Sequence, residues 1–353
     1  MGLRSELHET ARALVAPGKG ILAADESSGT IKKRFDSIDV ESTEDNRRAY
    51  REMLFRTAGA ADHVSGVILF DETIRQKAAD GTPLVEVLEK QGVIPGIKVD
   101  AGAKPLAFSE GETVTEGLDG LRERLAEYRE LGARFAKWRA TYSIDTASKG
   151  GSVPERQGGR RPTAYCLDVN AHALARYAAL CQEAGIVPIV EPEILMDGDH
   201  TIDESFTVTT RVLDEVFRQL VDQRVILEGM LLKPNMVLSG YDCAEQASVE
   251  SVADHTVRCF RLTVPAAVPG IVFLSGGQSD ELATAHLNAM NQLGPHPWEL
   301  SFSYGRALQA PALKAWSGKP DNVAAGQAAY LKRARLNGAA RDGSYTDAME
   351  AAS

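Results

Sequence analysis

The stretch VPIVEPE at residues 187–193 indicates the class of fold, because it combines the apolar run of a buried strand with two carboxylates at its end. Short runs rich in valine, isoleucine, leucine and phenylalanine are typical of strands in parallel sheets, whose two faces are both covered. Side chains two positions apart in a strand point to the same face. Glu191 and Glu193 are therefore predicted to lie together at the carboxyl end of one strand.

Runs of the same kind occur along almost the whole chain. The eight predicted strands are 20–25, 64–70, 96–100, 134–140, 187–193, 230–235, 271–275 and 300–304. Segments with helical periodicity separate them, such as 212–220, where apolar residues recur at three- and four-residue spacing. This alternation predicts an α/β protein, a single-domain (β/α)8 TIM barrel. A doubly wound sheet is the alternative, but no GxGxxG motif follows the first strand.

Three local features set the expected limits of these elements. We place the barrel at residues 1–337 and expect a flexible C-terminal tail at 338–353, a segment rich in alanine, glycine and serine. Ser42 and Asp45 have the spacing of a capping box, which predicts that the first long helix begins there. The polar, glycine-rich segment 146–161 is predicted to be a loop.

The composition is that of an ordinary globular protein, with 353 residues, 44% hydrophobic, 25% charged and a net charge of −10. An acidic chain argues against nucleic acid or an anionic membrane surface as a partner. No apolar run approaches the ~18 residues that cross a bilayer. Four cysteines without a CxxC pair argue against a disulfide framework and favour the cytoplasm. No HExxH motif or His/Cys cluster is present, so we expect no metal.

Ionisable side chains occur at the carboxyl ends of several predicted strands, where barrel proteins carry their chemistry. A lone lysine there usually extends to solvent, and a lone glutamate is usually structural. The set is more informative, because lysines and carboxylates that face one opening perturb each other's pKa values. Lys233 follows three apolar residues, so burial and a neighbouring cation such as Lys137 would favour its neutral, nucleophilic form. Glu191 could then transfer protons.

Two further segments suit a phosphate group. Ser275, Gly276 and Gly277 follow the seventh strand and precede a plausible helix start, where backbone N–H groups and the helix dipole favour an anion. Gly305 and Arg306 follow the eighth strand, and the loops after strands 7 and 8 often bind phosphate in barrels. A pair of glycines alone is typical of an ordinary turn.

With these residues in place, the sequence closely resembles class I fructose-bisphosphate aldolase, the metal-free, Schiff-base type. The matching segments are KGILAADES (19–27), GIKVD (96–100), FAKWR (135–139), GIVPIVEPEIL (185–195), LLKPNM (231–236), FLSGGQS (273–279) and SFSYGRALQ (301–309). The resemblance implies a cytoplasmic homotetramer that needs no cofactor. It implies reversible cleavage of fructose 1,6-bisphosphate to dihydroxyacetone phosphate and glyceraldehyde 3-phosphate, in glycolysis and gluconeogenesis.

The resemblance also implies roles for individual residues. Lys233 would form the Schiff base, Glu191 would act as general acid and base with Lys137 beside it, and Asp25 would deprotonate the C4 hydroxyl. The C1 phosphate would be held by Ser275, Gly276, Gly305 and Arg306. The other phosphate would be held by Ser27, Arg34 and Lys98, with Arg139 and Glu193 in support. Thr30 stands where the family has a serine, and residues 345–353 depart from the family's pattern of a terminal tyrosine.

Two other functions remain open at this point. The chain could be another Schiff-base barrel, such as a transaldolase or an aldolase with a different aldehyde acceptor. It could also be a scaffold or cytoskeleton-binding protein with a vestigial site. The residues expected at the barrel opening are the six basic ones named above and four acidic ones, Asp25, Asp100, Glu191 and Glu193. They give the opening a local charge of +2. We therefore expect a small, doubly phosphorylated sugar as the partner.

Overall fold

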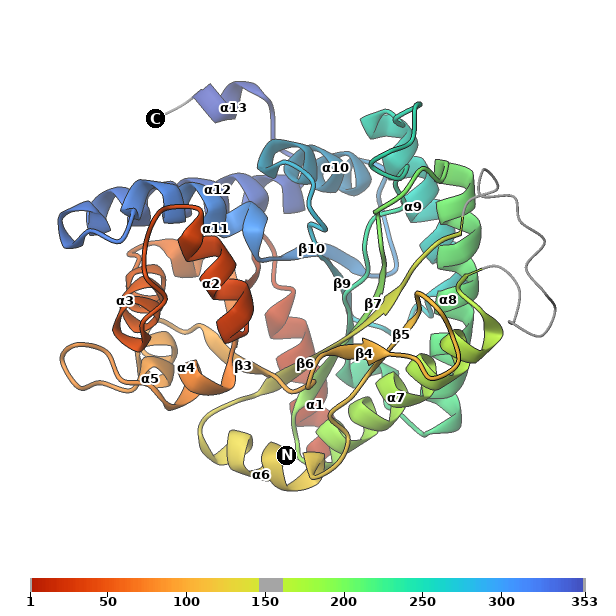
Figure 1. Cartoon of the computed structure of the whole chain (residues 1–353), viewed down its shortest axis with the longest axis horizontal. Helices are drawn as coiled ribbons and strands as arrows, with labels where there is room; N and C mark the ends of the chain where they lie inside the picture. Colours follow the sequence, from red (N-terminus) through yellow and green to blue (C-terminus); the bar gives the residue numbers. More distant parts are fainter. Residues whose placement is uncertain (1, 146–160, 352–353) are drawn as a thin grey trace.

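Eight parallel strands form the centre of the molecule in the computed structural model, which describes residues 2–145 and 161–351. The barrel strands are β1 (Gly20–Ala24), β2 (Val64–Leu69), β3 (Ile94–Lys98), β6 (Phe135–Tyr142), β7 (Val187–Ile194), β8 (Leu231–Leu232), β9 (Gly270–Phe273) and β10 (Glu299–Tyr304). They close in the order β1-β10-β9-β8-β7-β6-β3-β2. Neighbours in the barrel are thus neighbours along the chain, which confirms the predicted (β/α)8 barrel (Figure 1).

Helices surround the barrel and connect its strands (Figure 1). In the first half of the chain they are α1 (Leu3–Leu14), α2 (Ser28–Asp36), α3 (Glu44–Phe55), α4 (Asp71–Arg75), α5 (Leu84–Glu89) and α6 (Leu121–Glu130). The others are α7 (Ala164–Glu183), α8 (Ile202–Asp222), α9 (Val249–Thr263), α10 (Asp280–Gln292), α11 (Arg306–Trp316), α12 (Val323–Arg341) and α13 (Ala348–Ala351). No helix in the described ranges has both the length and the apolar composition that crossing a bilayer requires.

The side chains that point into the barrel change from apolar to charged along β6 and β7. In β6, Phe135 belongs to the apolar cluster inside the barrel, and Lys137 lies two positions further on. In β7, Ile189 belongs to the same cluster, and Glu191 again follows two positions later. Trp138 has the opposite parity and stacks on Tyr177 of the outer helix α7. The period of two thus places the charged groups inside the carboxyl half of the barrel.

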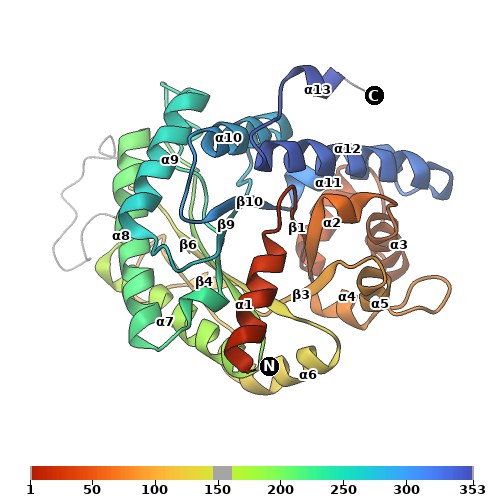
Figure 2. The same cartoon turned by 180° about the vertical axis from the view of Figure 1, so that it is seen from behind.

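Helix α1 closes the other end of the barrel. Its buried residues Leu7, Ala11 and Leu14 join the apolar cluster that the inward-facing strand residues form. Figure 2 shows the barrel from this side, with α1 lying across it. The interior is therefore packed at its amino end and polar at its carboxyl end.

Several element boundaries differ from the sequence-based expectations. The N-cap of α3 is Thr43, whose hydroxyl accepts a hydrogen bond from the Asn46 amide at 3.1 Å, so the capping box predicted from Ser42 is wrong. Strand β8 ends before Lys233, because Pro234 has no N–H to continue the ladder. A short hairpin of β4 (Ala103–Pro105) and β5 (Thr113–Thr115) was not expected. Segment 146–160, predicted as loop, lies outside the described residues.

The boundary that we placed after residue 337 falls inside helix α12. The helix continues through Gly338 to Arg341. Gly338 does not end the helix but allows its backbone to pack closely against Gly18. A Cβ at Gly338 would come within 2.6 Å of the Gly18 carbonyl oxygen. Further on, the ring of Tyr345 is buried, and its hydroxyl donates to the Glu350 carboxylate at 3.2 Å.

Candidate active site

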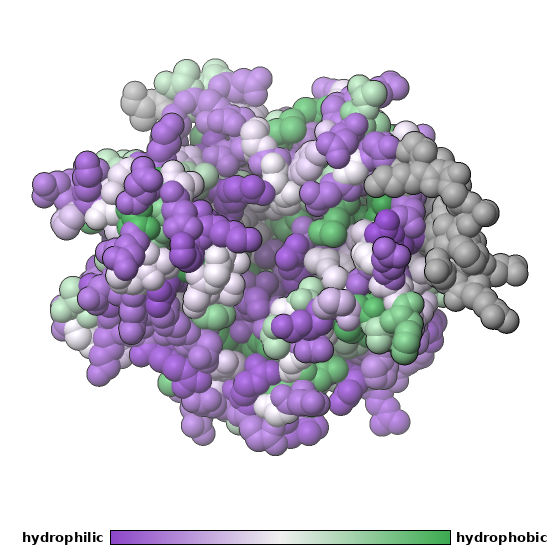
Figure 3. Space-filling model, viewed as in Figure 1, coloured by the Kyte–Doolittle hydropathy of each residue, from purple (hydrophilic) through white to green (hydrophobic). Residues whose placement is uncertain are grey.

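A cavity of about 810 Å³ opens at the carboxyl ends of the barrel strands. Figure 3 looks onto this face, where polar side chains surround a central hollow. The cavity is lined by every residue that the sequence predicted for the site: Asp25, Ser27, Arg34, Lys98, Lys137, Arg139, Glu191, Glu193, Lys233, Ser275, Gly276, Gly305 and Arg306. The barrel therefore brings together side chains that are far apart in the sequence.

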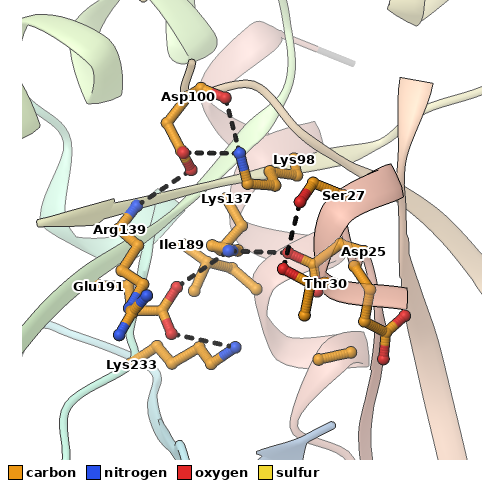
Figure 4. A network of polar contacts seen from close by, with 12 residues as sticks. Asp25, Ser27, Thr30, Lys98, Asp100, Lys137, Arg139, Ile189, Glu191 and Lys233 are labelled. Atoms are coloured by element: carbon orange, nitrogen blue, oxygen red, sulfur yellow. Dashed lines mark hydrogen bonds and ion pairs between the residues drawn. The ribbon is translucent and has the colours of Figure 1, made fainter. Parts of the chain in front are cut away.

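A chain of four charged groups crosses the floor of this cavity (Figure 4). Lys137 Nζ lies 2.7 Å from Asp25 Oδ2 and 3.2 Å from Glu191 Oε2. The other oxygen of Glu191, Oε1, lies 3.3 Å from Lys233 Nζ. Glu191 thus bridges the two lysines, as the strand register requires: Lys137 pairs with Ile189, and the Lys233 amide donates to the Val190 carbonyl at 2.8 Å.

All four side chains are largely removed from solvent, with exposed fractions of 5% or less for Lys137, Glu191 and Lys233 and 12% for Asp25. Burial acts to raise the pKa of Asp25, but the positive charges of Lys137 and Lys233 outweigh it and lower the pKa to about 2. Burial acts to lower the pKa of Lys137, but Asp25 and Glu191 raise it well above its usual value. Lys137 is therefore a fixed cation and Asp25 a fixed anion near neutral pH.

A second set of ion pairs forms the wall above this floor. Lys98 Nζ lies 2.6 Å from Asp100 Oδ1 and also donates to the Asp100 carbonyl oxygen at 2.7 Å. Arg139 forms an ion pair with Glu193 on the neighbouring strand. The second oxygen of Asp100 accepts a hydrogen bond from the Arg139 amide at 3.4 Å. These contacts orient Lys98 and Arg139 at the rim of the cavity.

The turn into α2 supplies the third side of the cavity. Ser27 stands at the N-cap position of α2, and its hydroxyl lies 3.2 Å from that of Thr30, so the threonine keeps a polar contact there. Arg34, one turn further on, forms an ion pair with Glu26. Sequence reasoning placed Arg34 at the site but missed Glu26 as its partner. With Glu26, the lining contains six basic and five acidic side chains, a charge of +1 rather than the expected +2.

The loops after β9 and β10 form the remaining side. Gly276 has a φ of 60°, in the left-handed region that favours glycine. The N-terminus of α10 was expected to favour an anion, but Ser279 caps it and Asp280 and Glu281 follow. The start of α11 fits better, because its N-cap is Gly305, which offers no side-chain cap.

Arg306 is the first residue of α11 and differs from the other cations of the cavity. It is exposed and has no ion pair with a carboxylate of the described residues. The other five basic side chains each have such a partner. Its charge is therefore available to an anionic ligand, beside Ser275, Gly276 and Gly305.

Three further lining residues were not singled out from the sequence. Thr141 lies one strand position beyond the predicted strand, and its hydroxyl is 2.8 Å from that of Thr113 in the hairpin. Ser303 also lines the cavity, and its buried hydroxyl has no hydrogen-bond partner among the residues that the structure describes. Phe70 adds an apolar group at the end of β2. In the described part of the chain, no group of three or more His, Cys, Asp or Glu side chains could hold a metal ion.

A closed (β/α)8 barrel with buried lysines and carboxylates at its carboxyl opening defines an enzyme of the barrel class. Comparison with known proteins identifies the family. The sequence profile of the family described as "Fructose-bisphosphate aldolase class-I" matches residues 6–353. The chain therefore belongs to the class I fructose-bisphosphate aldolase family, a family of carbon–carbon lyases (EC 4.1.2.13) that bind sugar phosphates.

Relatives from distant organisms agree with this family. A protein of Xanthomonas campestris pv. campestris named "Probable fructose-bisphosphate aldolase class 1" is 58% identical over 341 residues, 96% of this chain and 98% of the relative. "Fructose-bisphosphate aldolase 4, cytosolic" of Arabidopsis thaliana is 55% identical over 341 residues, 96% of this chain and 84% of the relative. The structure of Plasmodium falciparum aldolase, solved with TRAP and a small-molecule inhibitor, has a TM-score of 0.93 and 51% identity, covering 98% of this chain and 96% of that one.

Proposed function

We propose that this chain reversibly cleaves fructose 1,6-bisphosphate to dihydroxyacetone phosphate and glyceraldehyde 3-phosphate through a Schiff base on Lys233. The observation that carries the proposal is the buried chain Lys233–Glu191–Lys137–Asp25. It combines an amine, a cation and two carboxylates that can accept protons, and neighbouring groups in the chain lie within 3.3 Å of each other. These are the groups that iminium formation and carbon–carbon cleavage require.

The first step is addition of the Lys233 amine to the C2 carbonyl of the ketose. Transfer of a proton from Lys233 Nζ to Glu191 Oε1, 3.3 Å away, leaves a neutral amine beside a carboxylic acid. The amine adds to C2 and gives a carbinolamine. Glu191 then protonates the carbinolamine hydroxyl, which leaves as water, and the iminium forms. Lys137 stays positive throughout and stabilises the carboxylate that Glu191 becomes.

The second step breaks the bond between C3 and C4. Asp25 accepts the proton of the C4 hydroxyl, C4 becomes the aldehyde carbon of glyceraldehyde 3-phosphate, and the electron pair of the broken bond moves into the iminium. The enamine then takes up at C3 the proton that Asp25 accepted, and Asp25 returns to its carboxylate form. Water then hydrolyses the iminium, which releases dihydroxyacetone phosphate and restores Lys233. The 2.7 Å contact with Lys137 supports this role for Asp25, because it holds the carboxylate in place.

Two phosphate groups fit the two sides of the cavity. Ser275, Gly276, Gly305 and Arg306 would hold the C1 phosphate, and Arg306 has no ion pair with a carboxylate in the described part of the chain. Ser27, Arg34 and Lys98 would hold the other phosphate, with Arg139 and Glu193 in support. Arg34 and Lys98 are already ion-paired, so we expect the second phosphate to contribute less binding energy than the first.

The cellular setting is part of the same proposal. We expect a cytoplasmic homotetramer that acts in glycolysis and gluconeogenesis without a metal or another cofactor. The cytosolic name of the Arabidopsis relative and the absence of a CxxC pair in the sequence support this setting.

Borohydride trapping tests the mechanism directly. The protein is incubated with dihydroxyacetone phosphate and sodium borohydride, which reduces an iminium to a stable amine, and the modified residue is mapped by mass spectrometry. We expect modification at Lys233 in the wild-type protein and none at that site in Lys233→Met. Lys32→Met, on the exposed face of α2, is the matched control and should behave as wild type.

The alternative functions give different results in the same assay series. A different trapped lysine, or none, would overturn the proposed mechanism. Trapping at Lys233 with no cleavage of fructose 1,6-bisphosphate would point to a transaldolase or to an aldolase with another acceptor. A scaffold with a vestigial site would show neither trapping nor cleavage.

A further inference from the structure

Tyr241 lies in the loop that follows β8, outside the set of residues lining the cavity. Its ring is 43% exposed, yet its backbone is fixed: the Tyr241 amide donates to the Met196 carbonyl at 2.9 Å. Gly240 and Asp242 on either side donate to His200 and Gly198, at 2.8 and 2.9 Å. Three consecutive backbone hydrogen bonds therefore join the loop after β8 to the loop after β7.

The Tyr241 hydroxyl reaches across to the loop after β9. It donates a hydrogen bond to the carbonyl oxygen of Gly276 at 2.9 Å, and it lies 3.5 Å from the Met196 sulfur. A trans peptide places its carbonyl and the following N–H on opposite sides. By holding the Gly276 carbonyl, Tyr241 thus also fixes the direction of the Gly277 N–H. A glycine pair needs such support, because both residues have many accessible backbone conformations.

The packing around the two glycines leaves little freedom. A Cβ at Gly276 would come within 1.7 Å of the Met196 methyl carbon. A Cβ at Gly277 would come within 2.8 Å of Arg306 Nη2 and 3.3 Å of the Tyr241 hydroxyl. Side chains from the loops after β7, β8 and β10 therefore meet around the loop after β9. Arg306, the cation without an ion pair among the described carboxylates, is part of this contact.

The hydroxyl of Tyr241 can act only as a donor to the carbonyl while it keeps its proton. Burial raises the pKa of Tyr241 to about 12, although the charge of Arg306 acts in the opposite direction. The phenol is therefore protonated near neutral pH and can donate the hydrogen bond to Gly276 there.

We infer that Tyr241 is a positioning residue that holds the Gly276–Gly277 peptide in the orientation that receives a phosphate group of the substrate. The inference rests on the proposed function, in which Gly276 and Arg306 bind the C1 phosphate. Tyr241 itself touches no reacting atom. It acts through the carbonyl of Gly276, from the side away from the cavity.

The test compares two ketones that differ only in the phosphate. Tyr241→Phe removes the hydroxyl and keeps the ring. The half-saturating concentration for borohydride trapping at Lys233 is measured with dihydroxyacetone phosphate and with dihydroxyacetone. Loss of one neutral hydrogen bond should raise the value for the phosphate about three- to tenfold and leave the value for dihydroxyacetone unchanged. The maximal rate of trapping should also stay the same.

Two controls separate positioning from a general effect on the fold. Tyr165→Phe, on the exposed surface of α7, makes the same chemical change and should alter neither value. Incorporation of 4-aminophenylalanine at position 241 restores a donor at the same place and should recover most of the affinity for the phosphate. If Tyr241 only stabilises the fold, Tyr241→Phe should instead lower Tm and raise the half-saturating concentrations of both ketones alike.

Several outcomes would overturn the inference. The inference would be wrong if the half-saturating concentration rose equally for both ketones, or if it stayed unchanged for dihydroxyacetone phosphate. If the wild-type protein traps neither ketone, the proposed function fails, and binding of inorganic phosphate then decides the inference by itself. Weaker phosphate binding by Tyr241→Phe would support the positioning role, and equal binding would overturn it.

Discussion

Lys137→Met is the perturbation whose effect the structure defines most sharply. Lys137 is the shared partner of Asp25 and Glu191, and its side chain is 5% exposed. The variant keeps the shape of the side chain and removes the charge. Removing one partner of a buried pair typically costs about 3–5 kcal/mol, because the other charge stays buried without compensation. The lowering of the Asp25 pKa from 3.8 to about 2 corresponds to about 2 kcal/mol of this by itself.

The pH dependence of the loss follows from the sign of the Asp25 shift. In the wild-type protein the pKa of Asp25 lies below its unfolded value, so its stabilising contribution is complete above about pH 4 and is lost between about pH 4 and pH 2. In the variant, burial remains and the main cation is gone, so the pKa should rise above 3.8. The stability difference should therefore be largest at neutral pH and should narrow as the pH falls toward 4.

Thermal and urea unfolding at pH 7.5 and pH 4.5 measure this difference. For a chain of this length, 3–5 kcal/mol corresponds to a fall in Tm of about 4–7 °C at pH 7.5. Lys32→Met is the matched control, because the Lys32–Asp36 pair is exposed and should contribute less than 0.5 kcal/mol or so. If the loss of unfolding free energy in Lys137→Met is the same at both pH values, or no larger than in Lys32→Met, then the charge of Lys137 does not stabilise the buried Asp25 carboxylate. Asp25→Asn in the Lys137→Met background should recover part of the stability.

Three further predictions concern the phosphate side, a buried carboxyl and the absence of a metal. Arg306→Ala should raise KM for the bisphosphate about tenfold or more in steady-state assays, whereas Lys314→Ala on the same helix should not change it; an unchanged KM would remove Arg306 from phosphate binding. Burial raises the pKa of Asp280 to about 6, so its ionised form costs stability as the pH rises from about 4 to 6. Asp280→Asn should therefore raise the free energy of unfolding above pH 6 by about 1 kcal/mol after solvent screening, seen as a higher Tm, and should have no effect below pH 4; a constant effect would contradict this. Activity should survive EDTA, and a loss that zinc restores would point to metal-dependent chemistry.

The fold could be predicted because its signal repeats along the chain. Each barrel strand is a short apolar run, and within β6 and β7 the period of two separates Phe135 and Ile189 below from Lys137 and Glu191 above. The period of two alone therefore predicts charged residues at the barrel opening. The motifs around Lys233 then made the family recognisable, and the family comparison confirms that identification.

The remaining features depend on contacts that no local pattern contains. Glu26 is held by Arg34, by Arg51 on α3 and by Gln309 on α11, which lies 283 residues away in the sequence. Asp25 and Glu26 both follow β1, so the sequence alone does not show which of the two pairs with Arg34. The tail expected at 338–353 begins at Gly338, but this residue lies within α12, where a Cβ would come within 2.6 Å of the Gly18 carbonyl oxygen. In both cases the reason for the residue lies on another element.

Helix α1 packs across the amino end of the barrel, and the cavity lies at the carboxyl end. In the proposed reaction, the substrate would enter and both products would dissociate at the carboxyl end of the barrel. This limits the order in which the two products can dissociate. In the proposed reaction one half of the sugar stays covalently attached to Lys233 after cleavage, and only the aldehyde half is free to leave. We therefore expect the aldehyde to dissociate first and the covalently attached half to be released after it.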